Sequence, residues 1–231
     1  MVYAMQTAFI QHPLIEQEFR SMNIKPMWQT WAIGGGFQIV TNTPIRKVED
    51  FKGLKQAWVG AAARFIAKLG VEPVPLPYAE WYSSTKTGIV EGFGVGIAIT
   101  PIMHWDEVAK YVIFNIDLVT GAANGNFVNL DAWNALPDEI KKIAEEADRE
   151  AGQWGLKDQA ELERKAIVYI NEKMEVIQFP DEERAKFYEI GMVGVEEEWL
   201  ADLVPLGLLD EGKEIIEWAQ AKKAEIEKTM E

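Results

Sequence analysis

The run Gly92-Phe93-Gly94-Val95-Gly96 is the segment of this sequence that comes nearest to a nucleotide-binding loop. Such a loop needs the spacing G-x-G-x-x-G, which lets the backbone approach a diphosphate at the start of a helix. Ile97 stands where the third glycine should be, and no Gly-Lys-Ser or Gly-Lys-Thr triplet occurs in the chain. We therefore interpret these glycines as a structural turn rather than as a phosphate site.

Neighbouring carboxylates are the second candidates for chemistry, because two acids held together can divide the acid and base roles. They occur at Glu145-Glu146, Glu182-Glu183 and Glu196-Glu197-Glu198, in segments dense in Lys and Glu. Such segments usually form solvated helix faces. No serine stands in G-x-S-x-G, and no set of nucleophile, base and orienting group is found. We predict that the protein is not an enzyme and needs no cofactor.

Cysteine and histidine, the usual ligands of zinc, are scarce in the sequence. Cysteine is absent, which removes disulfides, thiol catalysis and cysteine-ligated zinc together. His12 and His104 lie far apart and outside any HxxH pattern, so each is expected at a helix cap or on the surface. A metal site is not predicted.

Nine tryptophans are the unusual feature of the composition. Some lie near strand ends and strand–helix junctions, where α/β sheets place ligand crevices: Trp28, Trp31, Trp58 and Trp81. For each of these, core packing is the commoner outcome, but as a group they favour an aromatic-walled cleft. Three further tryptophans fall at helical spacing within their own segments and are expected in the core: Trp154, Trp199 and Trp218.

The bulk composition is that of a globular protein. The chain has 231 residues, of which 48% are hydrophobic, and a net charge of −14. Because no basic patch with interleaved aromatics exists, a nucleic-acid partner is not expected. No run of eighteen apolar residues predicts a membrane span, and the first residues lack the basic start and cleavage site of a signal peptide.

Strand-type and helix-type segments alternate between residues 53 and 99, which is typical of an α/β layer. Residues 138–174 carry apolar side chains at steps of three or four. That period predicts one long helix, which either straddles two lobes or kinks near Gly152 and Gly155. The run Gly34-Gly35-Gly36 interrupts an extended segment and predicts a bend or a hinge.

Three segments, in this order, resemble the TRAP (tripartite ATP-independent periplasmic) solute receptors of the dicarboxylate-receptor type. The segments are TNTPIRKVEDFKGLK, LGVEPVPLPYAEWYSSTKTGIVEG and NFVNLDAWNALPDEIKKIAEEADREAG. The resemblance extends over nearly the whole chain. The family's opening hundred or so residues have no counterpart in the segments of this sequence.

The resemblance implies an α/β, two-lobed periplasmic-binding-protein-like fold with a long lobe-spanning helix and an incomplete first lobe. The first lobe would comprise residues 1–40 plus about 127–168, and the second about 41–126 plus 169–231. Because the first lobe would lack neighbours for its sheet edges, a homo-oligomer formed through that lobe is expected.

The resemblance also implies a function: the solute receptor of a TRAP transporter in the periplasm or another extracytoplasmic space. Its partners would be a small-molecule ligand, bound in the cleft between the lobes, and the membrane subunits of the transporter. The class-distinct alternative is a truncated homologue that no longer serves transport and acts as an oligomeric interaction or scaffold module.

The sequence departs from the family's carboxylate clamp. The arginine expected two positions beyond the lysine of the GLK motif is Ala57, a second arginine position is Phe37, and a ligand-binding asparagine aligns with Val95. A bidentate arginine–carboxylate pair is a strong, orienting contact, so its loss favours an apolar or aromatic ligand over a simple dicarboxylate. The ligand-binding residues expected on this basis are Phe37, Gln38, Gln56, Ala57, Trp58, Tyr78 and Val95.

Overall fold

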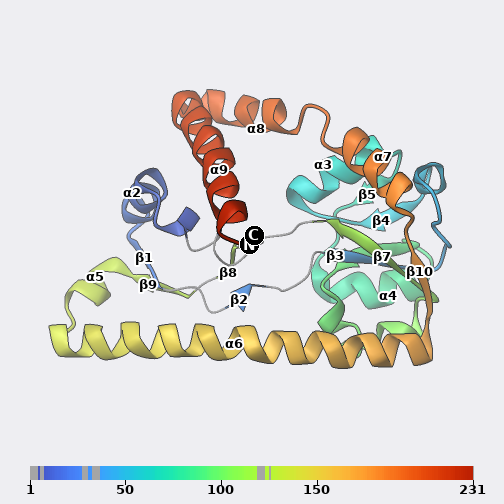
Figure 1. The fold of residues 1–231 in the computed structure, drawn as a ribbon, viewed down its shortest axis with the longest axis horizontal. Helices are drawn as coiled ribbons and strands as arrows, with labels where there is room; N and C mark the ends of the chain where they lie inside the picture. Colours follow the sequence, from blue (N-terminus) through green and yellow to red (C-terminus); the bar gives the residue numbers. More distant parts are fainter. Residues whose placement is uncertain are drawn as a thin grey trace. The chain divides into compact units, whose positions relative to one another are not determined.

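The computed structural model describes Met5 and residues 8–27, 31–32, 37–118, 123–124 and 126–230. The chain forms two compact units, whose helices and strands are labelled in Figure 1. Unit 1 comprises Met1–Gly34, Gly121–Ala160 and Leu200–Glu231, and unit 2 comprises Gly35–Thr120 and Glu161–Trp199. The predicted α/β architecture is confirmed. The predicted bend at Gly34-Gly35-Gly36 and the residue Trp28 lie outside the described residues.

The units differ from the predicted lobes mainly in two segments, and the boundaries near residues 121 and 161 also lie a few residues earlier than expected. The C-terminal residues, expected in the second lobe, group with unit 1, because helix α9 (Leu209–Met230) sets Trp218 against His12 with ring centroids 4.7 Å apart. This contact buries His12, which the sequence suggested for a cap or the surface; it stands at the N-cap of α2 (Pro13–Ser21) but makes no side-chain cap. Strand β3 (Phe37–Thr41), expected partly in the first lobe, pairs within unit 2.

Unit 2 is built on a six-stranded sheet in the order β10-β7-β3-β6-β4-β5. Apart from β3, its strands are β4 (Lys55–Ala57), β5 (Glu72–Val74), β6 (Gly92–Val95), β7 (Tyr111–Leu118) and β10 (Glu175–Gln178). β3 runs antiparallel to both of its neighbours, whereas the other five strands run parallel to one another. These five strands therefore end at one edge of the sheet, where β3 begins.

Apolar side chains cover both faces of this sheet. Helices α3 (Gly60–Lys68) and α7 (Asp181–Gly191) cover one face, where Phe65, Phe187 and Ile39 belong to one buried cluster. Helix α4 (Trp81–Lys86) lies against the other face, whose cluster contains Val40 of β3. Neighbouring residues of one strand therefore pack into the clusters on opposite faces of the sheet. For this reason the sequences of these strands are continuous apolar runs.

Gly92 and Gly94 lie in β6 and not in a turn, so the interpretation of the run as a turn was wrong for these two glycines. Gly96 follows the strand and precedes a 3-10 turn at Ile97–Ile99. A Cβ on Gly92 would lie 2.3 Å from the Val40 carbonyl oxygen, and a Cβ on Gly94 would lie 1.7 Å from the Trp58 ring. Both glycines are needed because another part of the chain packs directly against the strand. They are structural, as predicted, and form no phosphate loop.

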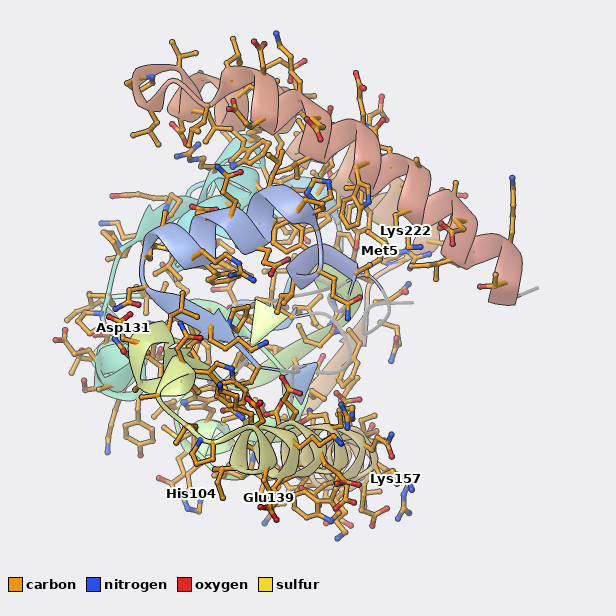
Figure 2. All side chains as sticks on the ribbon, turned by 90° about the vertical axis from the view of Figure 1, so that its left-hand side faces the viewer. Met5, His104, Asp131, Glu139, Lys157 and Lys222 are labelled. Atoms are coloured by element: carbon orange, nitrogen blue, oxygen red, sulfur yellow. The ribbon has the colours of Figure 1, made fainter. Side chains whose placement is uncertain are left out.

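Helix α6 (Asp138–Lys173) is continuous, which confirms the predicted long helix. At 1.5 Å per residue it is about 54 Å long. Its residues up to Ala160 belong to unit 1 and those from Glu161 onward to unit 2. Among its side chains, Glu139 and Lys157 are marked in Figure 2. Its last turns bury Ala166 and Ile170 in the cluster beneath the sheet of unit 2.

Unit 1 contains short strands in pairs and several helices. Strand β1 (Ile24–Pro26) pairs antiparallel with β9 (Phe127–Asn129), and β2 (Trp31–Ala32) pairs with β8 (Ala123–Asn124). The other elements are α2, α5 (Leu130–Asn134), the first part of α6, the end of α8 (Val195–Leu203), a 3-10 turn at Val204–Leu206 and α9. Asp131 of α5, labelled in Figure 2, accepts a hydrogen bond from Asn23 at 2.9 Å.

Two tryptophans expected in the core are exposed instead. Trp154 of α6 is 67% exposed, and Trp199 of α8 is also exposed. Helical spacing identifies a face of a helix, but burial requires a second element over that face. Within the part of the chain that the structure describes, no helix is long and apolar enough to cross a membrane.

Glu183 of α7 connects this helix to the 3-10 turn at Val48–Phe51. Its carboxylate accepts hydrogen bonds from Lys186 Nζ at 2.6 Å and from the Val48 N–H at 2.8 Å. The Lys186 ammonium, and then the Val48 N–H, hold the pKa of Glu183 below its ordinary value. A carboxyl group with a lowered folded-state pKa stabilises the native state above its unfolded pKa and loses that contribution as the pH falls.

Replacing Glu183→Gln is expected to lower stability at neutral pH and to have less effect in acid. The wild-type advantage should be present above about pH 4.3, the ordinary glutamate pKa, and decline as the pH falls through the lower folded-state pKa. Urea unfolding of both proteins at neutral pH and at about pH 3 measures this difference. Glu182→Gln, at the exposed neighbouring position, is the control. An equal deficit at both pH values would contradict the prediction.

Candidate functional site

The edge of the unit 2 sheet where the five parallel strands end is the candidate site. In open α/β sheets, ligands bind outside the carboxyl ends of the strands. β4 ends at Ala57, β5 at Val74 and β6 at Val95, while β3 starts at the same edge with Phe37. The antiparallel register places Gln38 of β3 opposite Val95, and the parallel register places Ala57 beside Phe93.

The structure brings the predicted residues to this edge from neighbouring strands. Phe37 and Gln38 open β3, Gln56 and Ala57 close β4, Trp58 follows β4, Tyr78 follows β5, and Val95 closes β6. As residues that line a cleft, they were expected to be accessible to a ligand, but most of them are not exposed. Of the seven, Tyr78 is exposed (44%), Phe37 is half-buried, and the remaining five are buried.

Trp58 packs on the backbone of the neighbouring strand. Its ring lies against Gly94, and its Nε1 donates a hydrogen bond of 2.9 Å to Gln56 Oε1. The indole therefore belongs to the core beneath α3 and α7. Gln56 is fully buried, and its Nε2 has no hydrogen-bond partner within the described residues. A buried donor left unpaired costs about 1–3 kcal/mol, so this amide is a group that a buried water molecule would stabilise.

Tyr78 begins a chain of aromatic rings that runs from the surface into the core. Its ring centroid lies 4.9 Å from Trp81 and 5.8 Å from Trp105, and Phe93 lies 4.7 Å from Trp105. Burial raises the pKa of the Tyr78 phenol, so the group stays neutral well above neutral pH. Trp105 is buried, and its Nε1 finds no partner in the described part of the chain.

Sequence reasoning missed Phe93 and Trp105, which join Tyr78 and Trp81 into one aromatic cluster. No sequence period connects the four residues, because they come from two 3-10 turns, the start of α4 and strand β6, which meet only in the folded unit. Chemically, this edge offers aromatic surface, amide and indole donors and a neutral phenol. Across the residues that the structure describes, no three His, Asp or Glu side chains are placed to share a metal ion.

A pocket of about 360 Å³ lies in unit 1, and none of the seven predicted residues lines it. Its lining side chains come from the segment before α2, α2 itself, β1, the start of α5 and one face of α6. The pocket was not foreseen because some of these segments lie more than a hundred residues apart in the sequence. The family segment that contains Leu130, Glu145 and Arg149 gives no indication of a pocket by itself.

Comparison with solved structures identifies the fold. A TRAP periplasmic solute-binding protein from Desulfovibrio salexigens, solved with bound orotic acid, superimposes with a TM-score of 0.79 at 21% identity. The match covers 94% of this chain and 69% of that one. The ectoine-binding protein TeaA of the TeaABC TRAP transporter superimposes with a TM-score of 0.76 at 19% identity, over 95% of this chain and 70% of that one. The fold is thus that of the TRAP solute-binding proteins.

The sequence comparisons establish the family. Residues 4–199 match the model of the bacterial extracellular solute-binding proteins of family 7 (DctP), and the chain belongs to this family. The sialic acid-binding periplasmic protein SiaP of Vibrio cholerae is 30% identical over 127 residues, which are 53% of this chain and 38% of that protein. A solute-binding protein of Sulfitobacter sp. is 26% identical over 145 residues, and the match spans less than half of that protein as well (43%).

Proposed function

We propose that this chain is part of a solute receptor of a TRAP transporter and captures a small organic molecule without changing it. The observation that carries the proposal is the convergence of Gln38, Ala57, Tyr78 and Val95 at the edge where five parallel strands end. Membership of a solute-binding family supports a role in capture over catalysis.

The ligand that this edge favours is neutral or aromatic. The seven positions carry no charged side chain, so a dicarboxylate would lack a bidentate cationic partner there. Tyr78 offers an exposed ring for stacking. The Trp105 ring lies 5.8 Å from it, and its N–H, which has no partner among the described residues, is a donor for a carbonyl or ring nitrogen. A flat heteroaromatic molecule with hydrogen-bond acceptors matches these groups.

The proposal extends to partners and compartment. A receptor of this class delivers its ligand to the membrane subunits of its transporter, so we place the whole protein in the periplasm or another extracytoplasmic space. Both points rest on relatives described as periplasmic. Co-purification of the membrane subunits with an affinity-tagged form of the protein would test the partnership.

The test of ligand capture is a thermal-shift screen against neutral heteroaromatics, monocarboxylates, dicarboxylates and sugars at equal concentration. A ligand that binds only the native state stabilises it, by about 2.7 kcal/mol when the free ligand concentration is a hundred times Kd. This stabilisation raises the melting temperature. We expect the heteroaromatics to give the largest rise. Calorimetry on Tyr78→Ala should then show weaker binding of the best compound by roughly tenfold, from the loss of one stacked ring.

Tyr111→Ala is the matched control, because Tyr111 opens β7 and therefore lies at the opposite edge of the same sheet. Equal weakening by the two variants would assign the effect to general destabilisation of unit 2. Tightest binding of dicarboxylates, with Tyr78→Ala unchanged, would place capture elsewhere in the molecule.

A second candidate function, the oligomeric scaffold, is favoured by exposed apolar side chains along residues 192–206. These are Met192, Val193, Trp199, Val204 and Leu206. A monomeric protein seldom exposes many large apolar groups in one stretch. Sedimentation at increasing concentration separates the candidates: a scaffold self-associates without ligand, whereas a concentration-independent monomer removes this candidate.

A further inference from the structure

The pocket in unit 1 has the size and the walls of a small-molecule site. Its volume of about 360 Å³ falls within the range of about 300–1,000 Å³ that such sites occupy. It lies among α2, β1, α5 and α6, of which α2, β1 and α5 face the viewer in Figure 2. The proposed capture site belongs to unit 2, so this pocket is a separate site.

One part of the pocket wall is apolar. Ile24, Pro26 and Met27 come from β1 and the residue that follows it, and Ile10 and Leu130 come from neighbouring segments. Met27 is buried, and its backbone N–H is held by the Asn126 carbonyl at 3.0 Å. Apolar side chains on a fixed strand provide a surface for a hydrocarbon group, because burying such a group there removes it from water.

Charged side chains make up most of the remaining wall, and not every one of them forms an ion pair. Arg20 pairs with Glu16 at 2.6 Å, and Lys25 pairs with Glu145 at 3.7 Å. Arg149, one helical turn beyond Glu145, also lines the pocket and makes no ion pair or hydrogen bond with any described residue. The pocket therefore carries one positive charge in excess, although the protein as a whole has a net charge of −14.

The unpaired positive charge of the pocket is the guanidinium group of Arg149. Arginine presents its N–H donors in a fixed fork that matches the two oxygens of a carboxylate. Lys25 adds a second cation at the same wall, and its ammonium also lies 5.6 Å from the centre of the Trp133 ring. Because Glu16 and Glu145 remain in the wall, a second negative charge on the ligand would be repelled. A cationic ligand would instead meet Arg149.

We propose that this pocket binds a small monocarboxylate with an apolar body. Arg149 holds the carboxylate through paired N–H groups, Lys25 adds attraction at the same wall, and the hydrocarbon part lies against Ile24 and Met27. The site needs no element of unit 2, so it operates independently of ligand capture at the strand edge.

Hexanoate is the probe, with hexanol and hexylamine as ligands of the same chain length and different charge. Calorimetry and ¹⁵N–¹H NMR titration on the full chain should show binding of hexanoate, with the largest shifts at amides of β1 and α6. Arg149→Gln should weaken hexanoate by roughly tenfold or more, because one charge-assisted contact is lost. Lys142→Gln removes a charge from an exposed position of the same helix that does not line the pocket, and should leave the affinity unchanged.

Other outcomes would overturn the proposal. If Arg149→Gln and Lys142→Gln weakened hexanoate binding equally, hexanoate would be attracted to the positive charges of the helix in general and not to Arg149 in particular. Hexylamine or hexanol binding as tightly as hexanoate would show that charge recognition is absent, and no saturable binding of hexanoate would show that the pocket takes no such ligand. Tyr78→Ala separates this site from the proposed capture site, because it should reduce capture of the heteroaromatic compound and leave hexanoate binding unchanged.

Discussion

Replacing Ala57→Arg is expected to lower the free energy of unfolding of unit 2 by about 3–5 kcal/mol, the cost of an uncompensated buried charge. The resemblance to carboxylate receptors locates a clamp arginine at this position, so the substitution would be expected to restore carboxylate binding. In the structure, however, Ala57 is fully buried in an apolar cluster with Val40, Phe93 and Val95. An arginine there would displace packed side chains and leave its guanidinium without water.

Urea unfolding followed by tryptophan fluorescence measures this effect. Ala61→Arg, at an exposed position in the first turn of α3, introduces the same side chain and should change stability by less than about 1 kcal/mol. A stable Ala57→Arg protein that gained affinity for succinate would show that position 57 faces an accessible carboxylate site. That result would contradict the proposal of a neutral or aromatic ligand.

Replacing Gly94→Ala is expected to cost about 3 kcal/mol, because the new methyl group would lie inside the volume of the Trp58 ring. The ring can move only by leaving Gln56, with which it shares a hydrogen bond inside the core. β6 lies between β3 and β4 and pairs with both, so its backbone is held on both sides. The substitution should therefore destabilise the part of the sheet that bears the proposed capture site.

A double-mutant cycle tests this cause. Trp58→Leu removes the obstructing ring, so Gly94→Ala should cost much less in that background, with a coupling energy of about 1–3 kcal/mol. Trp105→Phe alters the cluster on the opposite face of the sheet and should be additive with Gly94→Ala. Additivity of both pairs would mean that Trp58 is not what constrains position 94.

Local signals in the sequence predicted the helices and many of the strands. Pro13 stands in the first turn of α2, and Gly70, with a positive φ of 89°, follows the end of α3. The apolar steps along residues 138–174 predicted α6 almost to the residue. These features depend on neighbours within a few positions, which a sequence displays directly.

Pairing between distant strands could not be predicted in this way. β1 pairs with β9 across about a hundred residues, and β2 with β8 across about ninety, through strands of two or three residues. Such short segments carry no period that identifies a partner. The position of a strand depends on the other segments that cover its faces, and these segments come from distant parts of the chain.

The site was predictable in position but not in exposure. The resemblance and the strand ends indicated residues that do lie at one sheet edge, such as Gln38 and Val95. Whether each side chain there faces solvent depends on helices packed from elsewhere, and α3 and α7 enclose Trp58. Because both faces of the sheet are covered, alternation along the strands gives no signal for exposure.

The central position of β3 also has a consequence for synthesis. β3 is the first strand of its sheet to leave the ribosome, yet its two partners, β6 and β7, end about 54 and 77 residues later. At about 5–20 residues per second, the apolar segment Phe37–Thr41 waits about 4–15 s before both of its edges can be paired. During that interval, a nascent chain arrested before residue 95 exposes an unpaired hydrophobic strand. Such arrested chains should bind a chaperone more strongly than chains released beyond residue 120.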